Sequence, residues 1–158
     1  MSHFELQPGK LQLSDLRSWF YEHQTLKLSD EANDNIATSA KTVADVLDQG
    51  RVVYGINTGF GLLANTRIPP ERLTDLQRRI VLSHAAGTGD LMEDAVVRLM
   101  LLLKINSLSR GYSGVRQVLV DALIKLLNAE VYPCIPEKGS VGASGDLAPL
   151  AHMVLPLV

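Results

Sequence analysis

Apolar residues recur at three- and four-residue spacing along most of the chain, a pattern typical of amphipathic helices. A short helix is expected after the capping pair Ser14-Asp15, with Leu16, Trp19 and Phe20 on its apolar face. A longer helix is expected over about 30–48, with Ser29 as its cap and Gly50 at its end. Its apolar stripe consists of Ile36, Ala40, Val43 and Leu47.

A third helix is predicted over about 71–85, after the Pro69-Pro70 pair. The glycine-rich turn at residues 87–89 is expected to terminate it. One face carries an apolar stripe of Leu73, Leu76 and Ile80, and His84 continues that stripe at its end. A single histidine in such a position is usually structural, so a binding role needs further support.

Two more helices are predicted over about 93–109 and 114–129. The first is apolar nearly all round, which predicts deep burial. The second has Ser113 as its expected cap and an apolar stripe of Val115, Val118, Leu119, Ala122 and Leu126. The fold class is therefore mainly α. Because no repeat or linker interrupts the chain, residues 1–158 are expected to belong to one domain without an internal boundary.

The remaining segments read as irregular or extended. Residues 1–13 should be extended or irregular, with a turn at Pro8-Gly9. Residues 132–136 hold two X-Pro pairs, which favour an extended connector. A further helix is expected to start at Asp146. Pro149 is compatible with it, because a proline is tolerated in the first turn.

Composition narrows the function classes. The 158 residues are 46% hydrophobic with a formal net charge of −2, so charge gives no case for nucleic acid or an anionic membrane as partner. The single cysteine, Cys134, permits no internal disulfide and fits a reducing cytoplasm. We find neither a signal peptide nor a metal-ligand cluster. The apolar run over residues 153–158 leads us to expect the front part of a longer protein.

Three consecutive small residues, Ala143-Ser144-Gly145, can react with one another. The Gly145 nitrogen can attack the Ala143 carbonyl carbon, because glycine permits the tight approach that this requires. Loss of two waters then leaves the Ser144 side chain as an exocyclic methylene on a five-membered ring, which is a strong electrophile. Asp146 can take up protons during ring closure, or it can cap the helix that follows.

Composition alone favours an ordinary loop at this position. The segment is not a nucleophile elbow, because Asp146 stands where Gly-x-Ser-x-Gly needs its last glycine. It is not a phosphate loop either, because no Gly-Lys-Ser/Thr follows.

A second chemical stretch, residues 51–66, is rich in glycine around Tyr54. The three glycines within seven residues predict a loop, and in isolation Tyr54 reads as a half-buried aromatic whose hydroxyl finds a partner. A mobile loop with one acid–base group is also typical of an active-site lid.

The length of one motif changes this balance. The run Gly-Ser-Val-Gly-Ala-Ser-Gly-Asp-Leu-Ala-Pro-Leu-Ala-His-Met at 139–153 closely resembles the signature of the aromatic amino acid ammonia-lyases. Tyr-Gly-Ile-Asn-Thr-Gly-Phe-Gly at 54–61 resembles the tyrosine loop of that family, and residues 83–89 resemble another of its motifs.

The resemblance implies an N-terminal part of a mainly helical lyase that ends before the long-helix core. It implies 4-methylidene-imidazol-5-one, formed autocatalytically from Ala143, Ser144 and Gly145, with no metal and no dissociable cofactor. Tyr54 would take part in proton transfer, and Asn57, Gly61 and Asp146 would support the site. The family also implies a homotetramer whose active sites draw residues from more than one subunit.

The pair Ser83-His84 bears on the substrate. Family members that act on histidine resemble Ser-His here, and a polar imidazole needs a hydrogen-bond partner such as His84. The implied reaction eliminates ammonia from L-histidine and gives trans-urocanate. Two alternatives stay open: a tyrosine or phenylalanine lyase or aminomutase, and an inert helical fragment. The sequence also leaves open whether the substrate's amine or its ring attacks the electrophile.

Overall fold

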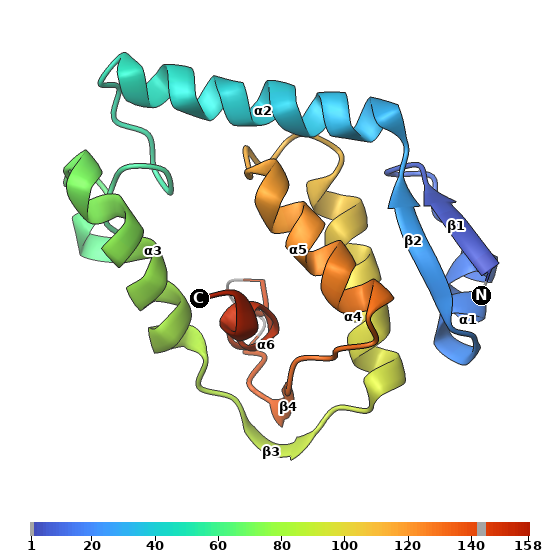
Figure 1. Cartoon of the computed structure of the whole chain (residues 1–158). Helices are drawn as coiled ribbons and strands as arrows, with labels where there is room; N and C mark the ends of the chain where they lie inside the picture. Colours follow the sequence, from blue (N-terminus) through green and yellow to red (C-terminus); the bar gives the residue numbers. More distant parts are fainter. Residues whose placement is uncertain (1, 142–144) are drawn as a thin grey trace.

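The computed structural model describes residues 2–141 and 145–158 and is mostly helical (Figure 1). Its helices are α1 Leu13–Tyr21, α2 Asp30–Asp48, α3 Pro70–His84, α4 Asp94–Leu108, α5 Gln117–Asn128 and α6 Leu147–Val154. Its strands are β1 Ser2–Leu6, β2 Gln24–Leu28, β3 Thr88–Leu91 and β4 Pro136–Lys138. Two short 3-10 turns are η1 Gly61–Leu63 and η2 Leu155–Leu157. The predicted mainly α class is confirmed.

The core lies where α4 and α5 pack side by side in the centre of the molecule (Figure 1). Helix α1 packs against α4, the β1–β2 ribbon flanks α5, and α2 crosses one end of the pair. Their apolar side chains meet in one cluster of buried residues, which includes Leu6, Trp19, Ile36, Leu101, Leu102, Ile105, Val120, Leu123, Leu127 and Ile135.

Strands β1 and β2 pair in parallel, from Ser2 opposite Gln24 to Leu6 opposite Leu28, with α1 as their connection. The side chain of Asn128, at the end of α5, extends the hydrogen bonding of β2. Its Oδ1 accepts from the Leu26 N–H at 2.7 Å, and its Nδ2 donates to the Leu26 carbonyl at 2.9 Å. One side chain thereby satisfies both backbone polar groups of Leu26 and joins α5 to the ribbon.

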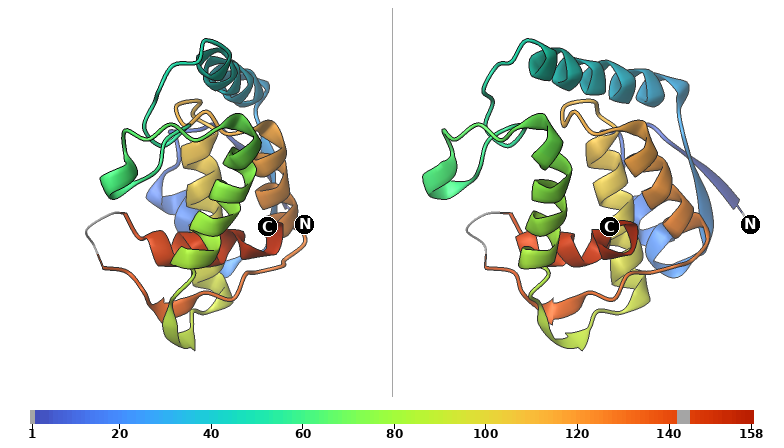
Figure 2. Two further views of the ribbon diagram at one scale, coloured as in Figure 1. Left: turned by 90° about the vertical axis from the view of Figure 1, so that its left-hand side faces the viewer. Right: turned by 60° about the vertical axis from the view of Figure 1, so that its left-hand side comes forward.

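Helix α3 packs against α6, and both lie on the side of α4 and α5 that is opposite to the β1–β2 ribbon (Figure 2). The segments that lead out of α3 and into α6 are joined by the antiparallel pair β3–β4, with Thr88 opposite Lys138 and Leu91 opposite Pro136. The Met92 N–H also donates to the Ile135 carbonyl at 2.9 Å. This half of the molecule carries the residues of chemical interest.

Several predicted element limits are confirmed. Helix α2 begins directly after Ser29 and ends before Gly50, whose φ of +66° is the left-handed value that favours glycine after a helix. Helix α6 begins directly after Asp146. Residues 51–66 are irregular apart from η1.

Two predicted helix caps are wrong. Helix α1 starts at Leu13, and its N-terminus is closed by the Asp15 carboxylate, which accepts from the Gln12 N–H at 2.8 Å. Helix α5 starts only at Gln117, because Gly114 packs directly on α2. A Cβ on Gly114 would lie 2.3 Å from Val43 Cγ2, and its N–H donates to the Ser39 hydroxyl at 2.8 Å. Ser113 therefore precedes a tight approach between segments and is not a cap.

Helix burial also departs from prediction. Helix α5 buries Val120, Leu123 and Leu127, whereas Val118 of the predicted stripe is 60% exposed. Its sequence is apolar on most sides, so periodicity did not select the correct face. On α4 one face is buried, but Val96 and Leu103 are exposed. The predicted stripe of α3, including His84, is only half-buried.

Candidate functional site

The candidate site begins at the N-terminus of α6, where Gly145 and Asp146 adopt left-handed backbone conformations with φ values of +76° and +57°. Ala143 and Ser144, two of the three residues predicted to cyclise, lie outside the described residues. Among the described residues, a Cβ built on Gly145 would meet nothing within 4 Å, and the positive φ is the feature that favours glycine here. A left-handed aspartate costs about 1 kcal/mol, which the surrounding contacts must offset.

The Asp146 side chain does not cap α6 with a hydrogen bond. Its carboxylate instead accepts a hydrogen bond from the Ser140 hydroxyl, from the segment that precedes the reactive tripeptide. Asp146 therefore occupies the N-cap position that the sequence predicted, while its side chain contacts Ser140.

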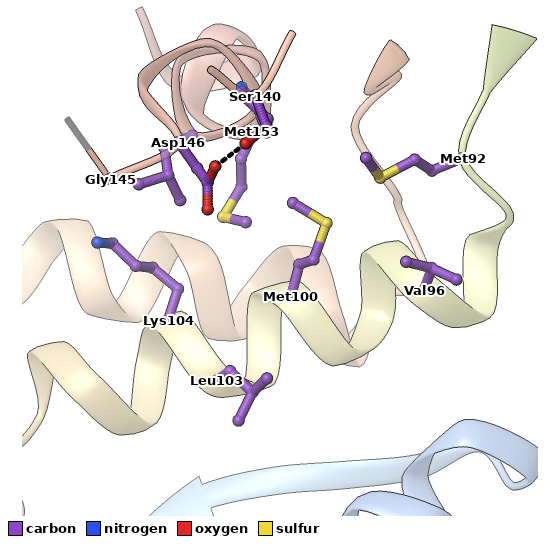
Figure 3. A pocket seen from close by; sticks show the side chains of 11 residues that line it. Met92, Val96, Met100, Leu103, Lys104, Ser140, Gly145, Asp146 and Met153 are labelled. Carbon is purple, nitrogen blue, oxygen red and sulfur yellow. Dashed lines mark hydrogen bonds between the residues drawn. The ribbon is translucent and has the colours of Figure 1, made fainter. Parts of the chain in front are cut away.

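A groove of about 500 Å³ lies beside Gly145 and Asp146, between α4 and α6 (Figure 3). Its floor is apolar, and the polar groups of Ser140, Asp146 and Lys104 lie at one end (Figure 3). Lys104 extends from α4 toward this polar end. The apolar lining consists of Met92, Val96, Met100, Leu103, Pro149, Leu150 and Met153.

Asn57 organises the loop that carries Tyr54. It is only 2% exposed, its Oδ1 accepts from the Val53 N–H at 2.9 Å, and its Nδ2 donates to the Arg51 carbonyl at 2.7 Å. These bonds close the backbone around Tyr54, which is itself 63% exposed. The Tyr54 ring meets the Phe60 ring edge-on at 5.6 Å, and Gly61 follows with a φ of +57°. The half-buried tyrosine expected from sequence is thus an exposed one.

His84 is the last residue of α3 and is half-buried. Its Nδ1 lies 2.7 Å from the Ile80 carbonyl oxygen and 3.1 Å from the Ser83 hydroxyl. A carbonyl oxygen only accepts, so Nδ1 carries the proton, and in the neutral ring Nε2 is the acceptor.

Helix α3 does not end at the glycine-rich turn 87–89 as predicted, because it already ends at His84. The helix closes at Ala85, and the chain then runs tightly against α6 into β3. The Gly87 N–H donates to His152 Nε2 at 3.0 Å. A Cβ on Gly87 would lie 3.1 Å from that nitrogen and 3.2 Å from Pro136, and one on Gly139 would lie 3.2 Å from the Gly87 Cα.

The structure thus brings two of the three singled-out stretches together. The segment after His84 contacts both the start and the end of the run at 139–153, through Gly139 and His152. His152 was not predicted as a site residue, although it lies within that run. Its pairing with Gly87 joins positions 65 residues apart, and no local pattern signals it.

The third stretch lies elsewhere. The Tyr54 loop connects to the N-terminal end of α3, whereas His84 is at its C-terminal end, and a helix of 15 residues is about 20 Å long (Figures 1 and 2). Neither Tyr54 nor His84 is among the described residues that line the groove beside Gly145.

No group of three or more histidine, cysteine or carboxylate side chains is placed to bind a metal ion in residues 2–141 and 145–158. Within the same ranges, no helix combines the length and the apolar character needed to cross a membrane.

The sequence and the fold of this chain are similar to those of known proteins. The sequence model of the family described as aromatic amino acid lyase matches residues 11–158. The histidine ammonia-lyase of Idiomarina loihiensis is 95% identical over all 158 residues, and the chain spans 31% of the length of that relative.

Solved structures share the fold. The crystal structure of histidine ammonia-lyase from Trypanosoma cruzi matches 98% of this chain with a TM-score of 0.89 and 38% identity, over 30% of its own length. Phenylalanine aminomutase of Pantoea agglomerans matches 98% of the chain with a TM-score of 0.87 and 34% identity, over 29% of its length.

Proposed function

The chain belongs to the aromatic amino acid lyase family, and from that premise we propose that it is the N-terminal part of an enzyme that eliminates ammonia from L-histidine to give trans-urocanate. The observation that supports L-histidine as the substrate is the 95% identity with a histidine ammonia-lyase along the whole chain. Fold likeness does not choose the substrate, because a phenylalanine aminomutase has nearly the same TM-score as a histidine ammonia-lyase, 0.87 against 0.89.

The described residues fit the methylidene-imidazolone group that the family implies. Gly145, whose nitrogen would enter the ring, has the positive φ that a tight backbone turn requires. It directly precedes Asp146, the N-cap residue of α6. The partial positive charge of a helix N-terminus would make the methylene of the ring more electron-poor. Once formed, the group supplies an electrophile that makes loss of the amine and of the β-proton feasible.

His84 has the role of binding the substrate imidazole. Because its Nδ1–H is directed to the Ile80 carbonyl, Nε2 can accept a hydrogen bond from the N–H of a substrate ring. The phenyl ring of phenylalanine has no N–H or O–H that can donate this bond, and a neutral hydrogen bond contributes about 1 kcal/mol. A histidine at this position therefore favours an imidazole substrate over a hydrocarbon ring.

Tyr54 has the role of proton transfer at the bound substrate, and its hydroxyl can both donate and accept. It is 63% exposed on a loop whose backbone Asn57 holds closed, so the loop can move toward a substrate without losing its internal bonds. Asp146 and Gly61 support the site through their left-handed backbone conformations. We further propose that the full-length protein is a cytoplasmic homotetramer, and that its sites are completed by residues outside this chain.

The test uses the full-length polypeptide that contains this chain. We expect urocanate to form from L-histidine, and the intact mass to fall short of the encoded mass by two waters with added near-ultraviolet absorbance. Ser144→Ala should retain both waters and lose turnover. Activity on tyrosine or phenylalanine in place of histidine would overturn the substrate assignment, and full activity of Ser144→Ala would overturn the electrophile.

A further inference from the structure

His152 has no role in the proposed chemistry, yet it makes a well-defined contact. It lies on α6, half-buried, and its Nε2 is 3.0 Å from the Gly87 backbone nitrogen. A backbone N–H only donates, so Nε2 must be unprotonated. The imidazole is therefore neutral, with its proton on Nδ1.

The partner of His152 is held on several sides. Around Gly87, a Cβ would come within 3.1 Å of His152 Nε2 and 3.2 Å of the Pro136 side chain. The backbone of Gly139 packs on Gly87 from the strand leading into the reactive run, because a Cβ there would be 3.2 Å from the Gly87 Cα. The hydrogen bond thus fixes one point of a segment that has no room to shift.

This point lies between two proposed functional groups. His84 precedes Gly87 by three residues, and the Ala86 N–H donates to the His84 carbonyl at 2.8 Å, so the connection is short and bonded. Gly145 precedes His152 by seven residues, most of them in α6. An α-helix is stiff at 1.5 Å per residue, so the position of His152 sets that of the helix N-terminus.

We propose that His152 is a positioning residue, whose neutral Nε2 accepts the Gly87 N–H and thereby holds the imidazole-binding His84 at a constant separation from Gly145. The proposal rests on the proposed function, because it gives His84 and Gly145 their roles. It assigns His152 no contact with substrate.

Kinetics of the full-length enzyme test it with three variants. His152→Leu removes the acceptor, and we expect the KM for L-histidine to rise about tenfold while two waters are still lost from the intact mass. His152→Gln places an amide oxygen near the position of Nε2 and should stay within about threefold of the unchanged enzyme. The control is Val154→Ala, which truncates a half-buried residue of α6 outside the lining given for the groove, and should lower the melting temperature without raising KM.

A merely structural role would give another result. In that case Val154→Ala and His152→Leu would change KM and kcat alike, and glutamine would not restore the KM. Either outcome overturns the proposal, as does loss of ring formation in His152→Leu.

A measurement on the 158-residue chain itself separates this proposal from the proposed function. Nitrogen-15 NMR should show Nε2 of His152 unprotonated, with a scalar coupling to the Gly87 amide proton across the hydrogen bond. A protonated Nε2 would overturn the positioning role even if histidine is turned over. The coupling together with inactivity of the full-length protein on histidine would instead locate the failure in the proposed function.

Discussion

At the scale of single residues, orientation distinguishes His84 from an ordinary core histidine. Its Nδ1 is committed to Ile80 within the same helix, and this leaves Nε2 as the atom for an outside donor. The sequence placed His84 on a helix face but contained no information on which nitrogen would be engaged. That was decided by the helix ending at this residue, where the ring folds back onto its own last turn.

His84→Leu in the full-length enzyme should raise the KM for L-histidine about tenfold, because the substrate ring would lose an acceptor and its N–H would be left unpaired. Leu82→Ala is the control, since Leu82 lies in the same last turn of α3 and is 46% exposed. Steady-state kinetics on histidine would decide. Equal losses in both variants would indicate that the end of α3 has been disturbed as a whole.

Gly87 offers a prediction that depends on sterics alone. Gly87→Ala should lower the free energy of unfolding by about 1 kcal/mol, because the new methyl group would lie 3.1 Å from His152 Nε2 and 3.2 Å from Pro136, closer than ordinary van der Waals contact. Urea denaturation of the chain measures the change. An unaltered midpoint would mean that α6 moves away at little cost, and that the close packing seen here does not hold the two segments together.

At the scale of elements, helices α5 and α6 are positioned by contacts with segments that are distant in the sequence. Helix α6 is short, at 8 residues, and is held by α3 and by the connector at Gly87. Helix α5 is held by Asn128, which bonds both backbone groups of Leu26, 102 residues away in sequence. Periodicity identified these helices, but it did not identify either contact.

Asn128→Ala should therefore destabilise the chain by about 1–3 kcal/mol, because the Leu26 N–H and carbonyl would lose their partner in a part-buried place. Asn33→Ala is the matched control, since Asn33 is exposed and accepts one bond from Gln117 at 3.1 Å. Its cost should stay within about 0.5 kcal/mol. Urea unfolding monitored by circular dichroism compares the two, and similar costs would contradict the role given to Asn128.

At the scale of the whole molecule, α4 has two apolar faces with different surroundings. Leu101 is fully buried in the core cluster, whereas Leu103 is 45% exposed and lines the groove beside Gly145. Periodicity could not separate them, because apolar residues occupy 10 of the 15 positions of this helix, among them both leucines. The two leucines provide an internal comparison of buried and exposed surface.

Leu101→Ala should lower the stability of the chain by about 2–5 kcal/mol through the cavity it leaves. Leu103→Ala should cost less than about 1 kcal/mol, because that side chain stays partly in water. Thermal or urea unfolding of both variants measures the difference. Comparable costs would show that the groove face is covered in solution.

The sequence by itself determined the helical class and most helix positions, because these depend on local periodicity, and it predicts a ring-forming chemistry for Ala143, Ser144 and Gly145 from residue types that stand next to one another. It also determined the family, through three motifs. The tertiary structure decided which helix faces are buried, that His152 bonds Gly87, and that Asn128 bonds Leu26. These outcomes depend on contacts between residues far apart in the chain, whose geometry arises only when the helices pack.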